Sequence, residues 1–289
     1  MDRVSTSQFY SRSLTQMTGL NVRADKLQTQ ISTTRKLDVA SDDAAGFTRL
    51  AGLKRDASAD KAVRGNLDLA AGILAQSDTA LGGITDQLQR AKELAVQANS
   101  GTLTAGQRAT IAQQLDGILQ DVASLANQSD ARGVPIFGGG GDAAFAIGAD
   151  GRVSYVGGTR PGTIPTGNDT AVQVTEDGTP LQAMFDTLSA LSAAVKSGQG
   201  IGEAGDQVST AIDNVSAMRG SIGARAMRLD MEMERLDEVG LGREEARSAI
   251  EDTDVTAAIT ELQKTLTILS ATQASFTKLT SLSLFDQLR

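Results

Sequence analysis

Residues 10–34 read YSRSLTQMTGLNVRADKLQTQISTT, and residues 255–283 read VTAAITELQKTLTILSATQASFTKLTSLS. In both stretches, apolar or small residues recur with the steps of a heptad pattern, which predicts a helix carrying a narrow apolar stripe. The stripe positions are Tyr10, Met17, Leu20, Ala24, Leu27 and Ile31 in the first stretch, and Val255, Ile259, Leu262, Leu266, Leu269 and Phe276 in the second. A lone helix cannot bury such a stripe, so each end of the chain needs a partner helix, in the same chain or in another copy.

The sequence between these ends predicts further helices. The clearest begins after the turn LDVASDDAAG at 37–46, where Ser41 or Asp42 can cap it, and runs to about Asn99. Its apolar row is Leu67, Leu74, Leu81, Leu88 and Ala95. The other helical patterns cover about 7–35, 105–128 (with Thr104 and Gln107 at capping-box spacing), 181–197, 203–238 and 243–280.

Helix-breaking residues are confined to one central stretch. All four prolines lie between 135 and 180, and 12 of the 30 glycines lie between Gly133 and Gly178. Within it, the runs AAFAI, RVSYV and TAVQVTE are short and apolar or alternating, which is typical of strands joined by tight turns. This stretch is therefore predicted to be a small β region.

The predicted fold class is mainly α: a long antiparallel helical bundle or coiled coil built from both termini, with a small central β-rich domain. We expect five parts in chain order. They are an N-terminal assembly helix at 1–40, the first half of a helical rod at 41–130, a β-rich outer domain at 131–180, the second half of the rod at 181–242, and a C-terminal assembly helix at 243–289.

The composition argues against an enzyme. The chain has no histidine and no cysteine, so the usual general base, the usual metal ligand and thiolate chemistry are all missing. Aromatic residues make up only 3%, which suits thin helical bundles better than a compact catalytic domain. The glycine runs at 138–141 and 148–151 match no phosphate-binding pattern and are expected to form turns. We expect no catalytic residue, no cofactor and no metal site.

Charge and hydropathy exclude other classes. The net charge is −8 without a basic run of five residues, so nucleic-acid binding is not expected. No run of 18 apolar residues occurs, so no membrane span is expected. The start MDRVSTSQFYSRS lacks the apolar core of a cleaved signal peptide, and export would need another route. A coiled-coil signalling module stays a further alternative, but the Pro- and Gly-rich region interrupts the heptads such rods keep.

The apolar stripes of the inner helices and those of the two outermost helices lead to different expectations. The inner helices can close a bundle within the chain. For the two outermost stripes we expect packing against other copies, because each extends past what the inner helices could cover. The predicted assembly seam is Tyr10, Met17, Leu20, Leu27, Ile31, Val255, Ile259, Leu262, Leu266, Leu269 and Phe276.

Four blocks of the sequence resemble one known family. They are SDDAAGF (41–47), DQLQRAKELAVQANSGT (86–102), MRGSIGARAMRLD (218–230) and ARSAIEDTDVTAAITELQK (246–264), and they are similar to bacterial flagellins and their hook-associated relatives. RVSTSQFY (3–10), IFGG (136–139) and SLFDQLR (283–289) resemble the hook-associated members found at the hook–filament junction. DDAAG at 42–46 is closer to flagellin, which stays the alternative.

The resemblance implies a structural role in the bacterial flagellum. It implies terminal helices that form a coiled-coil inner domain and a β-rich part that faces outward. The implied partners are further copies in a ring layer, another hook-associated protein on the hook side and flagellin on the filament side. It also implies an extracellular location, reached unfolded through the flagellar type III apparatus, with a dedicated export chaperone holding the C-terminal helix.

Overall fold

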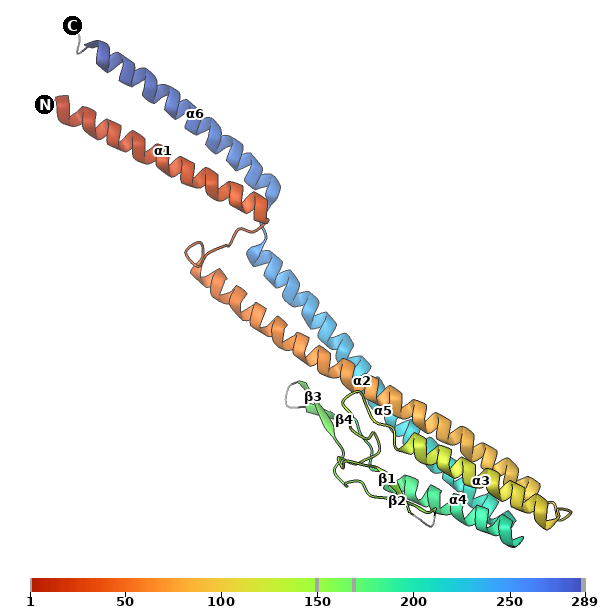
Figure 1. Ribbon diagram of the computed structural model, residues 1–289. Helices are drawn as coiled ribbons and strands as arrows, with labels where there is room; N and C mark the ends of the chain where they lie inside the picture. The colour runs from red at the N-terminus through yellow and green to blue at the C-terminus, as the bar shows by residue number, and fades with distance from the viewer. Residues whose placement is uncertain (1, 149–150, 168–169, 287–289) are drawn as a thin grey trace. The chain divides into compact units, whose positions relative to one another are not determined.

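The computed structural model describes residues 2–148, 151–167 and 170–286, and the side chains within 8–278 of these ranges (Figure 1). The blocks RVSTSQFY and SLFDQLR thus lie partly outside the described residues. The elements in chain order are α1 (Asp2–Thr33), α2 (Ala44–Ala98), α3 (Ala105–Ala126), β1 (Phe145–Ile147), β2 (Val153–Tyr155), β3 (Thr163–Gly167), β4 (Thr170–Gln173), α4 (Thr179–Ser197), α5 (Ile201–Glu251) and α6 (Val255–Asp286). The predicted class, mainly α with a small β region in the middle, is confirmed.

The chain divides into two compact units. The first is Met1–Ser58 with Val239–Arg289, and the second is Ala59–Glu238. In the first unit, α1 and α6 lie side by side and antiparallel (Figure 1). The outermost stripes therefore have partner helices within the chain.

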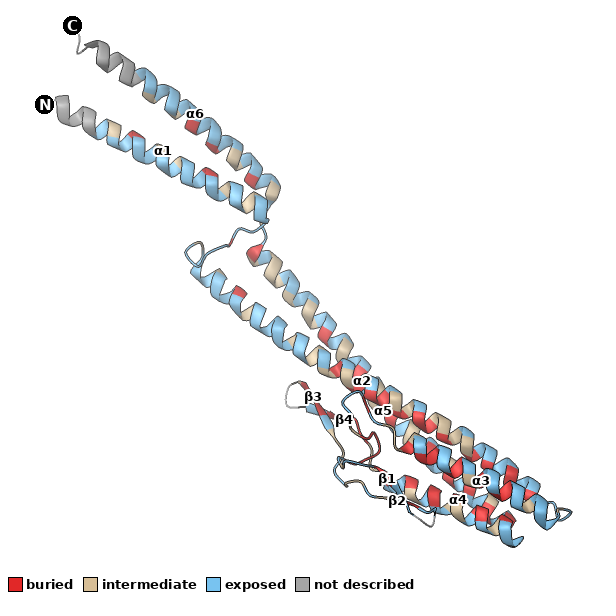
Figure 2. Cartoon of the chain, in the orientation of Figure 1, coloured by how far each residue is buried: buried red, intermediate tan, exposed pale blue. Residues whose placement is uncertain are grey.

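The second unit has its core among α2, α3, α4 and α5. The predicted leucine row of α2 lies at its centre, with Leu67, Leu74, Leu81 and Leu88 completely or almost completely buried. Figure 2 shows the buried positions concentrated where these helices lie together. At about 25 cal/mol per Å² of apolar surface removed from water, this core is the main source of stability in the unit.

Two β-hairpins follow the third helix. β1 pairs with β2 and β3 with β4, both antiparallel, and the second hairpin has a register shift between Pro165 and Gly167. The strand β3 was missed in the sequence because Pro165 interrupts a run that is otherwise short and polar. Asn127, at the end of α3, holds the first hairpin through its side chain, which accepts from the Phe145 N–H and donates to the Phe145 carbonyl.

The glycine run at 138–141 forms turns, as predicted. Gly139 and Gly140 have positive φ, and a Cβ on Gly139 would lie 1.9 Å from the Gly158 carbonyl oxygen. Position 139 therefore requires a glycine, both because its φ is positive and because a second chain segment approaches closely.

Two helix boundaries differ from prediction. α5 continues through Gly240 and Gly242 to Glu251, so the predicted separate helices 203–238 and 243–280 are wrong. The break comes instead at 252–254, where the Asp254 carboxylate accepts from the Ala257 N–H and caps α6.

The start of α2 is capped by a different residue than expected. Asp43 accepts from the N–H groups of Ala45 and Gly46, whereas Asp42 accepts from the N–H groups before it and from Lys26. The predicted capping box of α3 is confirmed: the Thr104 hydroxyl accepts from the Gln107 N–H and the Gln107 side chain accepts from the Thr104 N–H. Across the helices in the described ranges, we find no segment that is both long and apolar enough to span a bilayer.

Candidate assembly surface

The two terminal helices pack along a single seam whose positions step by three and four residues. α1 contributes Tyr10, Ser13, Met17, Leu20, Ala24, Leu27 and Ile31, and α6 contributes Val255, Ala258, Leu262, Thr265, Leu269, Thr272 and Phe276, all buried or half-buried. Other positions in these two spans are exposed, apart from the half-buried Gln30 and Glu261. This is the a/d pattern of an antiparallel two-helix coiled coil.

The predicted seam residues fall into two groups. Nine of them lie on this intramolecular seam, namely Tyr10, Met17, Leu20, Leu27, Ile31, Val255, Leu262, Leu269 and Phe276. The other two, Ile259 and Leu266, are 41% and 48% exposed and so lie off this intramolecular seam.

The small and polar members of the seam could not be recognised from the sequence. The largest apolar side chains of α6 favour Ile259 and Leu266, whereas the buried positions are Ala258 and Thr265. Thr265 can be buried because its hydroxyl donates to the Glu261 carbonyl one turn earlier. Both rows step by three and four residues from Val255, so the spacing alone could not separate them.

Two specific side-chain contacts join α1 to α6 along the seam. At the open end, the rings of Tyr10 and Phe276 meet edge to face, with centroids 5.5 Å apart and planes at 85°. Along one edge, Arg23 Nη2 lies 2.7 Å from Glu261 Oε1. Solvent reaches both side chains of this ion pair, which are 62% and 34% exposed, so it contributes little to stability and serves chiefly as an orienting contact.

The outer faces of the pair carry apolar side chains that nothing in the first unit covers. Exposed large hydrophobic residues are Phe9, Leu14 and Val22 on α1, and Ile259, Leu266 and Ile268 on α6. When the seam residues are assigned to heptad positions a and d, all of these residues except Val22 occupy the flanking e and g positions. Two helices bury only a and d, so apolar e and g positions favour packing against additional helices. Figure 2 shows that most of the described surface of both helices is exposed.

A shallow groove of about 780 Å³ runs along the outer side of α1. Ser11, Thr15 and Gly19 form a row of small residues in it, with Leu14 and Val22 beside them. A Cβ on Gly19 would meet nothing within 4 Å in this chain. The groove is thus shaped for a ridge of side chains from another helix.

A buried carboxylate lies at the base of the helix pair. Glu251 ends α5 and is 1% exposed. Its Oε1 lies 3.1 Å from Arg35 Nε and 3.4 Å from Lys54 Nζ, and its Oε2 lies 2.7 Å from Arg247 Nη1. Arg247 also pairs with Glu244, and hydrogen bonds to Glu244 and Glu251 raise the pKa of the guanidinium. The charge of Glu251 is therefore shared by three cations from three different segments.

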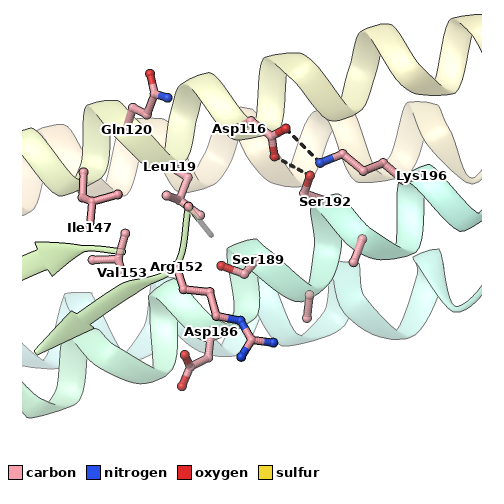
Figure 3. Close-up of a pocket in the computed structure, with 13 residues that line it drawn as sticks. Asp116, Leu119, Gln120, Ile147, Arg152, Val153, Asp186, Ser189, Ser192 and Lys196 are labelled. Carbon is pink, nitrogen blue, oxygen red and sulfur yellow. Dashed lines mark hydrogen bonds and ion pairs between the residues drawn. The ribbon is translucent and has the colours of Figure 1, made fainter. Parts of the chain in front are cut away.

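The second unit contains an open groove of about 740 Å³ between α3, α4 and the first hairpin (Figure 3). Asp116 accepts there from the Ser192 hydroxyl at 2.6 Å and from Lys196 Nζ at 2.9 Å. Partial burial alone would raise the pKa of Asp116, but these two hydrogen bonds outweigh it and hold the pKa below its ordinary value. The carboxylate is therefore ionised and already bound, which is typical of a structural contact between helices.

Comparison with known protein families identifies the class. Residues 4–141 match the N-terminal helical region of bacterial flagellin, and residues 206–287 match its C-terminal helical region. The two matched regions flank the hairpins and together take up most of the chain. The chain therefore belongs to the bacterial flagellin family, whose members are structural proteins.

Individual relatives include a hook-associated protein and a flagellin. The chain is 24% identical over 317 residues to flagellar hook-associated protein 3 of Escherichia coli (strain K12), covering 98% of this chain and 99% of that protein. It is 21% identical over 238 residues to a flagellin of Listeria monocytogenes, covering 82% and 81%. The crystal structure of the flagellar junction protein FlgL from Legionella pneumophila has the same fold, with a TM-score of 0.54, 12% identity, and coverage of 72% of this chain and 100% of that one.

Proposed function

We propose that this chain is the structural subunit that joins the hook of the bacterial flagellum to its filament. One observation carries the proposal: a match to a hook-associated protein extends over 98% of the chain, whereas the flagellin match covers less of it. The chain would act without catalysis, cofactor or metal, by forming a layer of identical copies.

The assembly surface would be the exposed outer faces of the α1/α6 pair. In place of the seam itself, which is occupied within the chain, we assign assembly to Leu14, Val22, Ile259, Leu266 and Ile268. These residues are apolar and exposed, and the groove along α1 offers a complementary row of small residues. Burying a few hundred Å² of apolar surface for each neighbour would contribute several kcal/mol before ordering costs, at roughly 25 cal/mol per Å². Assembly would therefore depend on the layer below as a template.

The partners follow from this place in the flagellum. They would be further copies in the same layer, another hook-associated protein on the hook side and flagellin on the filament side. Export would use the flagellar type III route, with a chaperone on the C-terminal helix until assembly. The final location would be extracellular.

Flagellin itself is the second candidate. The block DDAAG at 42–46 and the match to the Listeria flagellin favour it. A flagellin adds to itself without limit, so its two axial surfaces must be complementary to each other. A junction subunit has one surface for the layer below and a different one for flagellin.

Reconstitution on isolated hooks tests the proposal. Hooks from a strain that lacks this chain would be incubated with the purified chain and then with flagellin, and filaments counted by electron microscopy. We expect filaments only on hooks that received the chain first, and none when Leu266→Asp replaces the parent. Filament growth on hooks that never received the chain would contradict the junction role.

A further inference from the structure

We propose that Glu251 is a positioning residue for the assembly surface: its buried carboxylate fixes the register in which α1 pairs with α6. Only the link from this register to the assembly surface rests on the proposed function. The register itself can be measured on the unassembled chain.

The connectors at the base of the pair are tied to each other around Glu251. The Lys36 N–H donates to the Glu251 carbonyl at 2.8 Å, and the Thr253 N–H donates to the Thr34 carbonyl at 2.9 Å. Arg35 and Asp252 form the antiparallel bridge between these two bonds. The residues that follow α1 and precede α6 are therefore held opposite each other.

The same place holds a strained backbone. Thr34 has φ of +57°, and among the described residues it alone, glycines aside, has a positive φ. A β-branched residue in the left-handed region is unfavourable and persists only where surrounding contacts impose it. Here the imposing contacts are the Thr253 N–H on the Thr34 carbonyl and the ion pair between Arg35 and Glu251.

Apolar packing cannot fix the register at this point. Across 237–257, a stretch that is described throughout, Glu251 is the one buried residue. Between Ala24 and Leu67, also fully described, only Leu37 and Leu50 are buried. A charged carboxylate surrounded by three cations has a single favourable position, whereas an apolar contact of this size has several.

The seam beyond the connectors is close to periodic. Its residues repeat every seven positions, so sliding one helix by a heptad replaces apolar residues with similar ones. Coiled coils of this kind take their register from single polar residues at buried positions. A slip of one heptad moves one helix by about 10 Å along the other. Such a slip would displace Ile259 and Leu266 relative to Leu14 and so change the outer edge.

Cysteine cross-linking tests the register, because the chain has no cysteine of its own. The pair Tyr10→Cys with Phe276→Cys reports the observed register, in which the two rings are in contact. The pair Tyr10→Cys with Leu269→Cys reports a one-heptad slip. Disulfide formation falls off steeply once the two Cα atoms are more than about 7 Å apart, so the ratio of the two products reports which register predominates.

We expect the parent to give the 10–276 disulfide almost exclusively. In Glu251→Gln, which keeps the shape but leaves three cations around a neutral amide, we expect the 10–276 product to fall several-fold and the 10–269 product to appear. Glu251→Asp, which keeps the charge, should retain most of the 10–276 product. The matched control is Glu261→Gln, which removes the partly exposed pair with Arg23 and should change neither yield.

Two results would overturn the proposal. In the first, Glu251→Gln gives the same yield of the 10–276 disulfide as the parent. In the second, Glu251→Gln gives neither disulfide, which would mean that Glu251 is needed for the pairing of α1 with α6 rather than for its register. Should Glu251→Gln lose its helical circular dichroism, Arg35→Gln decides the question in the same assay. A register shift in a chain that still joins hooks to filaments would contradict the assembly surface proposed above, while leaving the role of Glu251 in place.

Discussion

Leu266 and Leu269 lie one turn apart on α6, yet Leu266 is 48% exposed and Leu269 is 8% exposed. Leu269 packs in the seam against α1, whereas Leu266 lies on the outer edge. The same substitution at the two positions must therefore affect different interactions.

We predict that Leu266→Asp abolishes assembly and leaves the chain's melting almost unchanged, because a charge at an exposed position costs the monomer less than about 0.5 kcal/mol. Leu269→Asp should destabilise the α1/α6 pair by roughly 3 kcal/mol, since it places a charge in a seam that cannot solvate it. Amide exchange of 10–31 and 255–276 measures the difference. Equal exchange in the two variants would refute the division between seam and edge.

The turn at Gly139 offers a test of steric crowding separate from backbone strain. Gly139 and Gly101 both have φ of +53°, but a Cβ on Gly101 would meet no atom within 4 Å, whereas one on Gly139 would lie 1.9 Å from the Gly158 oxygen. Gly101→Ala should cost about 1 kcal/mol for its backbone angle. Gly139→Ala should cost several kcal/mol because the two segments must separate. Urea unfolding of each variant measures the costs, and similar values would show that the close approach is not maintained in solution.

The side chain of Asn127 joins α3 to the first hairpin through its two bonds to Phe145, of 2.8 Å and 3.1 Å. Asn127→Ala should lose roughly 1–3 kcal/mol, because it leaves the partly buried N–H and carbonyl of Phe145 without their partner. In this variant, hydrogen exchange of the backbone amides in β1 and β2 should become faster. Gln128→Ala, which leaves both Phe145 bonds in place, is the control, and an equal acceleration there would contradict the assignment.

Asp130 predicts a specific loss of stability in acid. Burial alone would raise its pKa, but the Arg132 guanidinium and the N–H groups of Val134 and Arg132 outweigh burial and lower the pKa below its ordinary 3.8. Because the folded pKa is lower than the unfolded one, the contribution is fully present above pH 3.8 and is lost as pH falls through the folded pKa. Chemical denaturation between pH 5 and about pH 2 should show a shallower decline in Asp130→Asn than in the parent. If the free energy of unfolding falls equally with pH in both proteins, Asp130 does not cause the loss of stability in acid.

The parts of the fold that could be predicted from sequence are those set by local pattern. The leucine row from Leu67 to Leu88 and the capping box at Thr104 were found because period and cap chemistry lie within a few residues of each other. The passage of α5 through Gly240 and Gly242 was missed, since each exposed glycine costs a helix about 1 kcal/mol and local reasoning ends the helix there.

The candidate site was harder to predict because it depends on pairing. The heptads at both ends were visible, but a stripe does not state whether its partner is in the same chain. α5 ends at Glu251, whose carboxylate contacts Arg35 and Lys54, and both of these residues are distant in sequence. The outer position of Leu266 follows only once Thr265 is known to face α1.

Self-assembly in the presence of two templates tests the central claim most directly. Purified chain at high concentration would be added to isolated hooks and, separately, to filament fragments, and the length of any new material measured by negative-stain electron microscopy. A junction subunit should add one short layer of fixed height to hooks and should form no long filament on either template. Long helical filaments made of this chain alone would contradict the junction assignment and would identify it as a filament subunit.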